Sequence, residues 1–227
     1  MKTKFGSIIV DGRGKIGGHV ASKNRAGSYL RTKVTPVNPR TSFQSAVRNS
    51  MSINTKAWRG LYDEDRNTWA AAVADFARSN VFGDKKTLSG FGLYCSINNN
   101  LRSINKAVKA QCPVPMSVPT TNVVSLVVDT VGNAINLTMS GAVPANTSMV
   151  VRATSPQSAG KSFFKSEYRN LVVVAAAHVA LVDLYSDYTT RFGALTQLGM
   201  KIALEIFFVD NTSGITSGRA TVVTTIV

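Results

Sequence analysis

The chain has 227 residues, 44% of them hydrophobic, and a formal net charge of +14. This length accommodates one large domain or two small ones, and the apolar fraction is sufficient for a buried core. No apolar run reaches the roughly 18 residues that a membrane-spanning helix needs, so we expect no membrane partner. The N-terminal residues lack the long apolar core of a signal peptide, and none is expected.

The basic charge is concentrated near the N-terminus. Residues 1–60 contain twelve Lys or Arg and one acid, Asp11, which gives +11, whereas the other 167 residues give +3. Such asymmetry indicates an arm that meets nucleic acid or an acidic protein surface; the alternative is a solvated face that aids solubility. The residues predicted to contact a partner are Lys15, Lys23, Arg25, Tyr29, Arg31, Lys33, Arg40 and Arg48.

Residues 1–40 are predicted to form a basic extended arm, because glycines and charged residues interrupt every apolar run. Short strands are predicted at Ser7–Val10, Ile16–Ser22 and Ser28–Val34. A hairpin turn is predicted at Asn24–Gly27, since Asn and Gly tolerate positive φ. These pieces have too little apolar area for a core of their own, so we expect them to pair with a neighbouring chain or lie along a surface.

Residues 41–112 are predicted to form a small helical module. Thr41 or Ser42 caps a first helix over 42–60, where apolar residues recur at helical spacing. A third helix is predicted over about 89–106, with Cys95 packed in the core of the module.

The second helix of this module is predicted to begin at Asp63 as its cap, with further acids in its first turn. Its apolar stripe contains Trp69, Val73 and Phe76. The predicted structural core of the module consists of Trp58, Leu61, Trp69 and Phe76.

The amino-acid composition changes after residue 112. Residues 113–121 contain three prolines and are predicted to be an extended linker between domains. Residues 122–227 hold six or seven short β-branched segments separated by turn residues, with no helix pattern, which is typical of a β-sandwich of the immunoglobulin or fibronectin-III kind. Within it, Leu171–Val182 is predicted to be a buried strand that contains His178, and residues 201–227 a final hairpin that ends in an edge strand. The predicted class is therefore α+β multidomain.

The sequence offers little for catalysis. The two histidines, His19 and His178, lie in unrelated contexts, and the two cysteines, Cys95 and Cys112, form no CxxC pair. The glycine-rich segment 12–18 lacks the GK[ST] ending and the following helix of a phosphate loop. We therefore expect no enzyme, no metal site and no cofactor.

Two acids, Asp183 and Asp187, lie four residues apart beside Tyr185 and Tyr188, in a segment predicted to be a loop. Two carboxylates supply fewer oxygen ligands than a hard cation needs, so no cation site is predicted there.

Nucleic-acid binding has more support. Basic residues alternate with Phe5 and Tyr29 in the arm, and extended glycine-rich backbone can follow a phosphate track. The chain contains no recognisable base-reading motif, so any such binding is expected to tolerate all sequences.

The N-terminal half resembles a family of tailed-phage virion structural proteins, including those of crAss-like phages. The resemblance covers about 90 residues, in GRGKIGGHVASKNRAGSYLRTKVTPVNPRTSFQSAVR (12–48), AWRGLYDEDRNTWAAAVADFAR (57–78) and NVFGDKKTLSGFGLYCSINNNL (80–101). The residues that match the ordered pattern are Ser22, Asn24, Arg25, Gly27, Tyr29, Arg31, Pro36, Asn38, Pro39, Thr41, Gln44, Arg48, Trp58, Leu61, Arg66, Trp69, Ser89 and Gly90.

The resemblance implies a non-enzymatic virion protein, made in the host cytoplasm, whose partners are major capsid, portal or tail proteins and copies of itself. Three roles stay open. The leading one is a capsid-associated auxiliary or decoration component anchored by the basic arm. The second is a neck, tail or fibre-base ring component, and the third is a packaging or cargo protein that binds nucleic acid through the arm without sequence preference.

Overall fold

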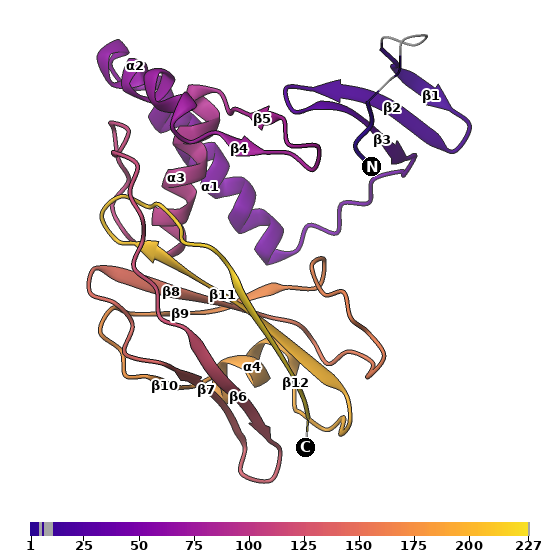
Figure 1. Cartoon of the computed structure of the whole chain (residues 1–227), viewed down its shortest axis with the longest axis vertical. Helices are drawn as coiled ribbons and strands as arrows, with labels where there is room; N and C mark the ends of the chain where they lie inside the picture. Colours follow the sequence, from indigo (N-terminus) through magenta and orange to yellow (C-terminus); the bar gives the residue numbers. More distant parts are fainter. Residues whose placement is uncertain (5, 7–10, 227) are drawn as a thin grey trace. The chain divides into compact units, whose positions relative to one another are not determined.

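The computed structural model describes residues 1–4, 6 and 11–226 (Figure 1). This part of the chain contains four α-helices and four antiparallel sheets, which is compatible with the α+β class. The chain divides into two compact units: Met1–Asn99 with Lys109–Pro115, and Asn100–Val108 with Met116–Val227. One crossing between the units, after Pro115, lies within the segment that was predicted to be a linker.

The first unit begins with a three-stranded sheet in the order β1-β2-β3, formed by β1 (Gly14–Ile16), β2 (His19–Asn24) and β3 (Gly27–Thr32). The hairpin predicted at Asn24–Gly27 is confirmed: these two residues pair across β2 and β3, and Gly27 has a φ of 100°. Such a φ is easily reached only by a residue without a Cβ atom.

The single strand predicted at Ile16–Ser22 is wrong. A turn at Gly17, with a φ of 56°, splits it into the end of β1 and the start of β2. The predicted strand at Ser7–Val10 lies outside the described residues, as does Phe5, one of the two aromatic residues noted in the arm. In the described part of residues 1–40, Ala21 alone is buried, so the sheet has almost no core of its own.

The helix predicted over 42–60 is confirmed as α1 (Ser42–Arg59). The hydroxyl of Thr41 accepts a hydrogen bond from the Gln44 amide, which satisfies one of the unpaired donors of the first turn. Several apolar residues of α1 are exposed rather than buried, among them Phe43, at 61%, and Val47, at 66%.

The second helix is shorter than predicted. In α2 (Asp63–Ala71) the N-cap is Tyr62, so the prediction that Asp63 caps the helix is wrong: Asp63 is its first residue. The helix continues as a 3₁₀ turn, η1 (Ala72–Ala74), and Phe76 follows it. In a 3₁₀ turn, residues three positions apart lie on the same side. The helix-like spacing of apolar residues in the sequence therefore continues past the end of the α-helix.

The first unit also contains a short hairpin, β4 (Arg78–Ser79) with β5 (Lys85–Lys86), and α3 (Gly90–Ser103) up to Asn99, since the last residues of this helix belong to the second unit. The predicted third helix is thereby confirmed. The core of the module centres on Trp69, which is fully buried and donates from its indole nitrogen to the Ala110 oxygen at 2.6 Å. Tyr94 lies between the two tryptophans, with ring centroids 5.3 Å from Trp69 and 5.1 Å from Trp58. Cys95 is buried as predicted.

Of the four predicted core residues, Trp69 is therefore fully buried, whereas Trp58, Leu61 and Phe76 are half-buried. The sequence also gave no sign of Asn98, whose buried amide exchanges two hydrogen bonds with the backbone of Lys109. This amide holds the chain that follows α3 against the helix.

The second unit contains two antiparallel sheets. One has the order β10-β7-β6 and the other the order β12-β11-β8-β9 (Figure 1). The strands are β6 (Val123–Asp129), β7 (Ala134–Met139), β8 (Thr147–Ala153), β9 (Arg169–Val174), β10 (Leu181–Asp183), β11 (Lys201–Asp210) and β12 (Ala220–Thr225). Inward-facing residues of both sheets form one hydrophobic core.

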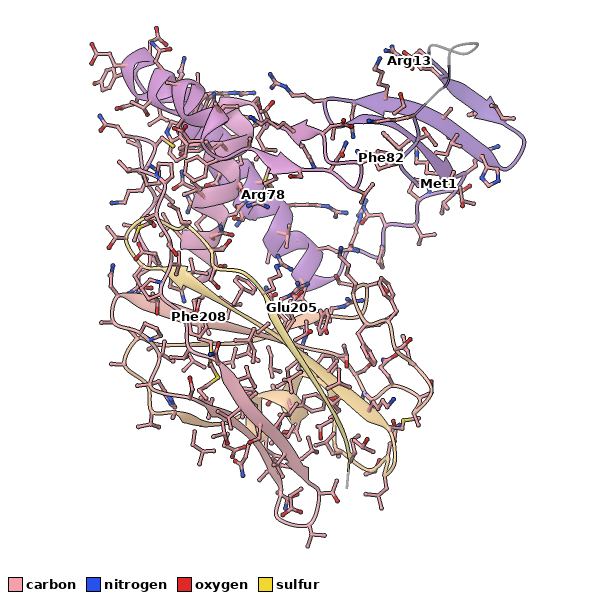
Figure 2. All side chains as sticks on the ribbon, in the orientation of Figure 1. Met1, Arg13, Arg78, Phe82, Glu205 and Phe208 are labelled. Atoms are coloured by element: carbon pink, nitrogen blue, oxygen red, sulfur yellow. The ribbon has the colours of Figure 1, made fainter. Side chains whose placement is uncertain are left out.

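Alternation along β11 shows how this core is built. Ile202, Leu204 and Ile206 belong to the core, whereas Glu205, which is labelled on β11 in Figure 2, belongs to the opposite face of the sheet. The predicted final hairpin is confirmed: β11 pairs with β12 from Lys201 opposite Thr225 to Ile206 opposite Ala220, and β12 is an edge strand.

Two predictions for this unit are wrong. The apolar run Leu171–Val182 is not one strand, because β9 ends at Val174, Ala177 adopts a φ of 59°, and β10 begins at Leu181. His178 is therefore an exposed residue of the connection between β9 and β10 rather than a buried strand residue. A continuous apolar run does not distinguish a long strand from two short ones.

The second error concerns the helix α4 (Tyr185–Phe192), which replaces the predicted loop around Asp187. Tyr188 and Phe192 lie one turn apart, with ring centroids separated by 4.9 Å. Tyr188 is fully buried in the core and Phe192 packs against it. Eight residues are too few for a reliable periodic signal, which is why the sequence did not reveal this helix.

Candidate functional site

The face of the N-terminal sheet that carries Tyr29 gathers basic residues. Lys15 on β1 pairs with Val20, and Val20 pairs with Arg31 on β3, so their side chains share one face. Tyr29 lies two residues before Arg31 and therefore on the same face. The structure thus brings together three of the predicted contact residues, Lys15, Tyr29 and Arg31.

Lys2 joins this group, since it forms a β-bridge with Tyr29. Lys2 is not among the contact residues predicted from the sequence. No local pattern could have found it, because the two residues are 27 positions apart and meet only through strand pairing.

The other predicted contact residues are dispersed. Lys23 lies on the opposite face of the sheet, and its ammonium group is 3.6 Å from the carboxylate of Asp11. Arg25 is in the β2–β3 turn, and Lys33 follows β3. Arg40 lies just before α1 with a φ of 50°. Arg48 is on α1 and donates to the Asn38 side-chain oxygen at 2.8 Å.

Most of these cations lack an acidic partner. In the part of the chain that the structure describes, no carboxylate lies within ion-pair distance of Lys15, Arg25, Arg31, Lys33 or Arg40, and all five side chains are exposed. Their charge is therefore available to an external anion.

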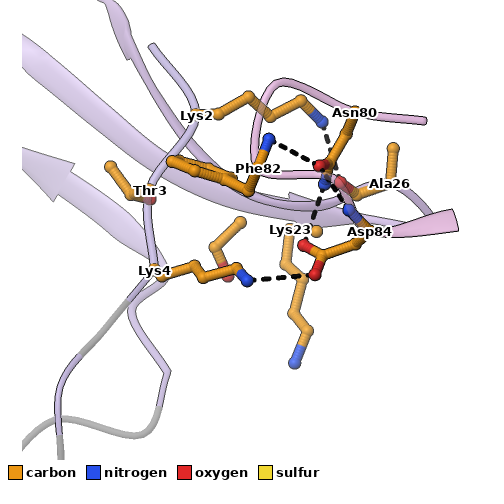
Figure 3. Close-up of a pocket in the computed structure, with 10 residues that line it drawn as sticks. Lys2, Thr3, Lys4, Lys23, Ala26, Asn80, Phe82 and Asp84 are labelled. Atoms are coloured by element: carbon orange, nitrogen blue, oxygen red, sulfur yellow. Dashed lines mark hydrogen bonds and ion pairs between the residues drawn. The ribbon is translucent and has the colours of Figure 1, made fainter. Parts of the chain in front are cut away.

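A pocket of about 270 Å³ lies in the first unit, beside the β2–β3 turn (Figure 3). It is lined by Lys2, Thr3, Lys4, Lys23, Ala26, Gly27, Ser28, Asn80, Phe82 and Asp84. Lys4 forms an ion pair of 3.0 Å with Asp84 and lies 5.5 Å from the Phe82 ring centroid. Hydrogen bonds from Lys4 and Asn80 lower the pKa of Asp84, so this carboxylate stays charged at neutral pH.

A second charged cluster lies on the outer face of the four-stranded sheet. Glu205 accepts from Arg152, its direct cross-strand partner on β8, and from Arg219 at 3.0 Å. Its side chain is only 8% exposed, and Tyr168 lies beside Arg152. Both oxygens of this carboxylate already accept hydrogen bonds from the two guanidinium groups. We therefore interpret this cluster as structural.

In the described residues, no three His, Cys, Asp or Glu side chains are grouped closely enough to hold a metal ion. The same described residues contain no helix with the length and hydrophobicity required to span a bilayer.

Comparison with known proteins gives no relative. No protein-family model, curated protein or solved structure matches the chain.

Proposed function

We propose that this chain is a non-enzymatic structural protein of a tailed-phage virion, attached to an acidic partner through its N-terminal sheet. The observation that carries the proposal is a group of exposed cations, Lys15, Arg25, Arg31, Lys33 and Arg40, none of which has an acidic partner among the described residues. The ordered pattern from Ser22 to Gly90 that resembles phage virion proteins supplies the context. Among virion positions, we favour a capsid-associated auxiliary or decoration component.

Charge decides which kind of partner the sheet meets. Residues 1–60 carry +11 of the net charge of +14, so the basic sheet of one copy is repelled by the same region of another copy. A different virion protein with an acidic surface, such as a major capsid, portal or tail protein, fits better. Contacts between copies of this chain are then expected to use other surfaces.

For the second unit, we propose a fibronectin-III-like sandwich. Lettered in chain order from β6 as A to β12 as G, the sheets read A-B-E and D-C-F-G. This differs from the constant-type immunoglobulin order, ABED with CFG, only in the fourth strand, which pairs with the third. The exchange of that strand to the other sheet supports the fibronectin-III alternative. It implies a fold and no particular chemistry.

Charge reversal tests the attachment. The triple variant Lys15→Glu, Arg31→Glu and Lys33→Glu should reduce incorporation into particles at least about tenfold, because attraction to an acidic surface becomes repulsion. The matched control reverses Lys56, Lys85 and Lys86, which are exposed residues of the helical module. Equal loss in both variants would show that net charge, not this sheet, governs incorporation. Labelled density in assembled particles would then separate a capsid position from a neck or tail position.

A second candidate function is non-specific nucleic-acid binding for packaging. The observation that favours it is the position of Tyr29 on the same face as Lys15 and Arg31, which allows a base to stack beside phosphate contacts. This function predicts that binding weakens as salt is added. In a plot of the logarithm of the binding constant against the logarithm of the salt concentration, the slope should be about −0.7 to −0.9 for each phosphate contact. Absence of binding to single- and double-stranded DNA at low salt would exclude it.

A further inference from the structure

One side of α1 serves as a packing surface over the C-terminal part of the helix. Residues spaced three and four positions apart share this side, namely Phe43, Ala46, Val47, Ser50, Met51 and Asn54. Asn54 is buried, and its amide donates to the Asn99 side-chain oxygen on α3 at 2.8 Å. Trp58 continues the contact against the ring of Tyr94. This side of α1 therefore packs against α3.

The same side of α1 is exposed toward its N-terminus. Phe43 and Val47 are 61% and 66% exposed, and Met51 lies where the exposed part meets the packed part. These three residues, called the α1 row below, are each about one turn apart and together span about 12 Å of the helix. A single exposed apolar side chain needs no explanation, but a row that prolongs a packed surface indicates a further contact.

Two cations lie beside the α1 row. Arg48 is three residues before Met51, so the two are neighbours on the helix surface. Arg48 donates to the Asn38 side-chain oxygen at 2.8 Å, a neutral acceptor that leaves its charge uncompensated. Arg40 lies two residues before the helix begins. Among the described residues neither arginine has a carboxylate within ion-pair distance, and α1 itself contains no Asp or Glu.

We propose that the N-terminal half of α1 docks into an apolar groove with an acidic rim on a different protein of the particle. Phe43 and Val47 enter the groove, and Arg40 and Arg48 meet the acids of its rim. A second copy of this chain fits less well, because a second α1 against the row would bring a like pair of arginines toward the first. The inference rests on the proposed attachment function and adds an apolar contact to it.

The test measures binding of the purified full-length protein to particles assembled without it, by co-sedimentation. The double variant Phe43→Gln and Val47→Gln removes both apolar side chains, keeps a good helix former at each position, and should weaken binding at least about tenfold. The matched control is Phe163→Gln with Val131→Gln, which removes the same two side-chain types from exposed positions of the second unit. Equal weakening by both double variants, or undiminished binding by the α1 variant, would overturn the proposal.

Salt separates the apolar contact from the charged one. Arg48→Glu should weaken binding about tenfold at low salt and less at high salt, because added ions screen exposed charges. The weakening caused by the Phe43 and Val47 substitutions should persist at high salt, since burial of apolar surface is not screened. A loss in the apolar double variant that disappears at high salt would contradict docking through the α1 row.

Two other measurements examine other occupants of the row. A lower midpoint of thermal unfolding in the α1 double variant, but not in the control, would assign the row to packing within the chain. A concentration-dependent dimer in analytical ultracentrifugation that the α1 double variant loses would assign it to a second copy. Either result would overturn the proposal.

The two levels of inference fail separately. If the wild type and the α1 double variant bind particles equally well, only the docking of α1 is contradicted. If the wild type does not bind particles at all, the attachment function fails, and the docking of α1 fails with it.

Discussion

The hydroxyl of Tyr188 on α4 donates a hydrogen bond of 2.9 Å to the main-chain oxygen of Thr154, just after β8. Tyr188 is fully buried, and burial raises the pKa of its phenol far above the usual value, so the group stays neutral. The Thr154 hydroxyl accepts in turn from the Ala203 amide at 3.1 Å. These hydrogen bonds hold α4, which follows β10 and precedes β11 in the chain, against the core of the second unit.

Replacing this tyrosine gives the first prediction. Tyr188→Phe removes the hydrogen bond to the buried main-chain oxygen of Thr154. This substitution should therefore lower the free energy of unfolding by about 1–2 kcal/mol. Tyr185→Phe is the control, because its hydroxyl bonds to Asn133 on the exposed surface. That change should cost less than about 0.5 kcal/mol. Urea unfolding followed by circular dichroism measures both, and equal effects would contradict the assigned role of Tyr188.

The second prediction concerns the contact between α2 and α3. A Cβ atom on Gly90 would lie 3.1 Å from the Ala70 nitrogen and 3.2 Å from its Cα, and backbone atoms cannot move aside cheaply. Gly90→Ala should therefore destabilise the helical module by about 1–3 kcal/mol. Gly92→Ala meets only the Ser89 and Leu88 side chains, and the higher helix propensity of alanine should offset that contact. A smaller loss in Gly90→Ala than in Gly92→Ala, measured by thermal unfolding, would contradict this packing.

Cys112 supplies the third prediction. Burial, with a smaller contribution from the charge of Asp75, raises the pKa of this thiol to about 11. The thiolate is the reactive form, so at pH 8 we expect alkylation by iodoacetamide to be slower than in the unfolded chain by the order of a hundredfold. A Cys95→Ala background isolates the signal, since Cys95 is also buried. Alkylation at the unfolded rate would contradict the raised pKa.

The same shift predicts how stability depends on pH. Because the folded-state pKa lies above the unfolded value of about 8.5, the thiol contributes full stability below pH 8.5 and progressively less as pH rises toward 11. Cys112→Ser should make the alkaline loss of stability shallower in that range. Unfolding free energies measured from pH 7 to 11 test this.

The sequence predicted the elements that have strong local signals. Thr41 and Gly60 mark the ends of α1 by their capping chemistry, and the pair Asn24 and Gly27 marks a hairpin by its tolerance of positive φ. These signals are read within a few residues, so they do not depend on the rest of the fold.

The candidate sites could not be predicted in the same way. Lys4 and Asp84 meet across 80 positions, and Arg152 and Glu205 across 53, through pairings that no local pattern records. The basic charge indicated which region of the chain holds the candidate site, but the strand register decides that Lys15 and Arg31 share a face and that Lys23 does not. Tertiary pairing, not composition, therefore determines the sites.

The last prediction concerns the independence of the N-terminal sheet. Of its described residues only Ala21 is buried, and the Lys4–Asp84 ion pair that ties it to the helical module is about half exposed at both ends. Exposed pairs contribute about 0–1 kcal/mol, so deleting residues 1–40 should change the unfolding free energy of the remaining chain by less than about 1 kcal/mol. The isolated 1–40 peptide should show no cooperative thermal transition, because it cannot bury enough apolar surface to offset its chain entropy. A deletion that costs several kcal/mol would show that the sheet is part of the module's fold, and the basic face would then need a structural role as well as a binding one.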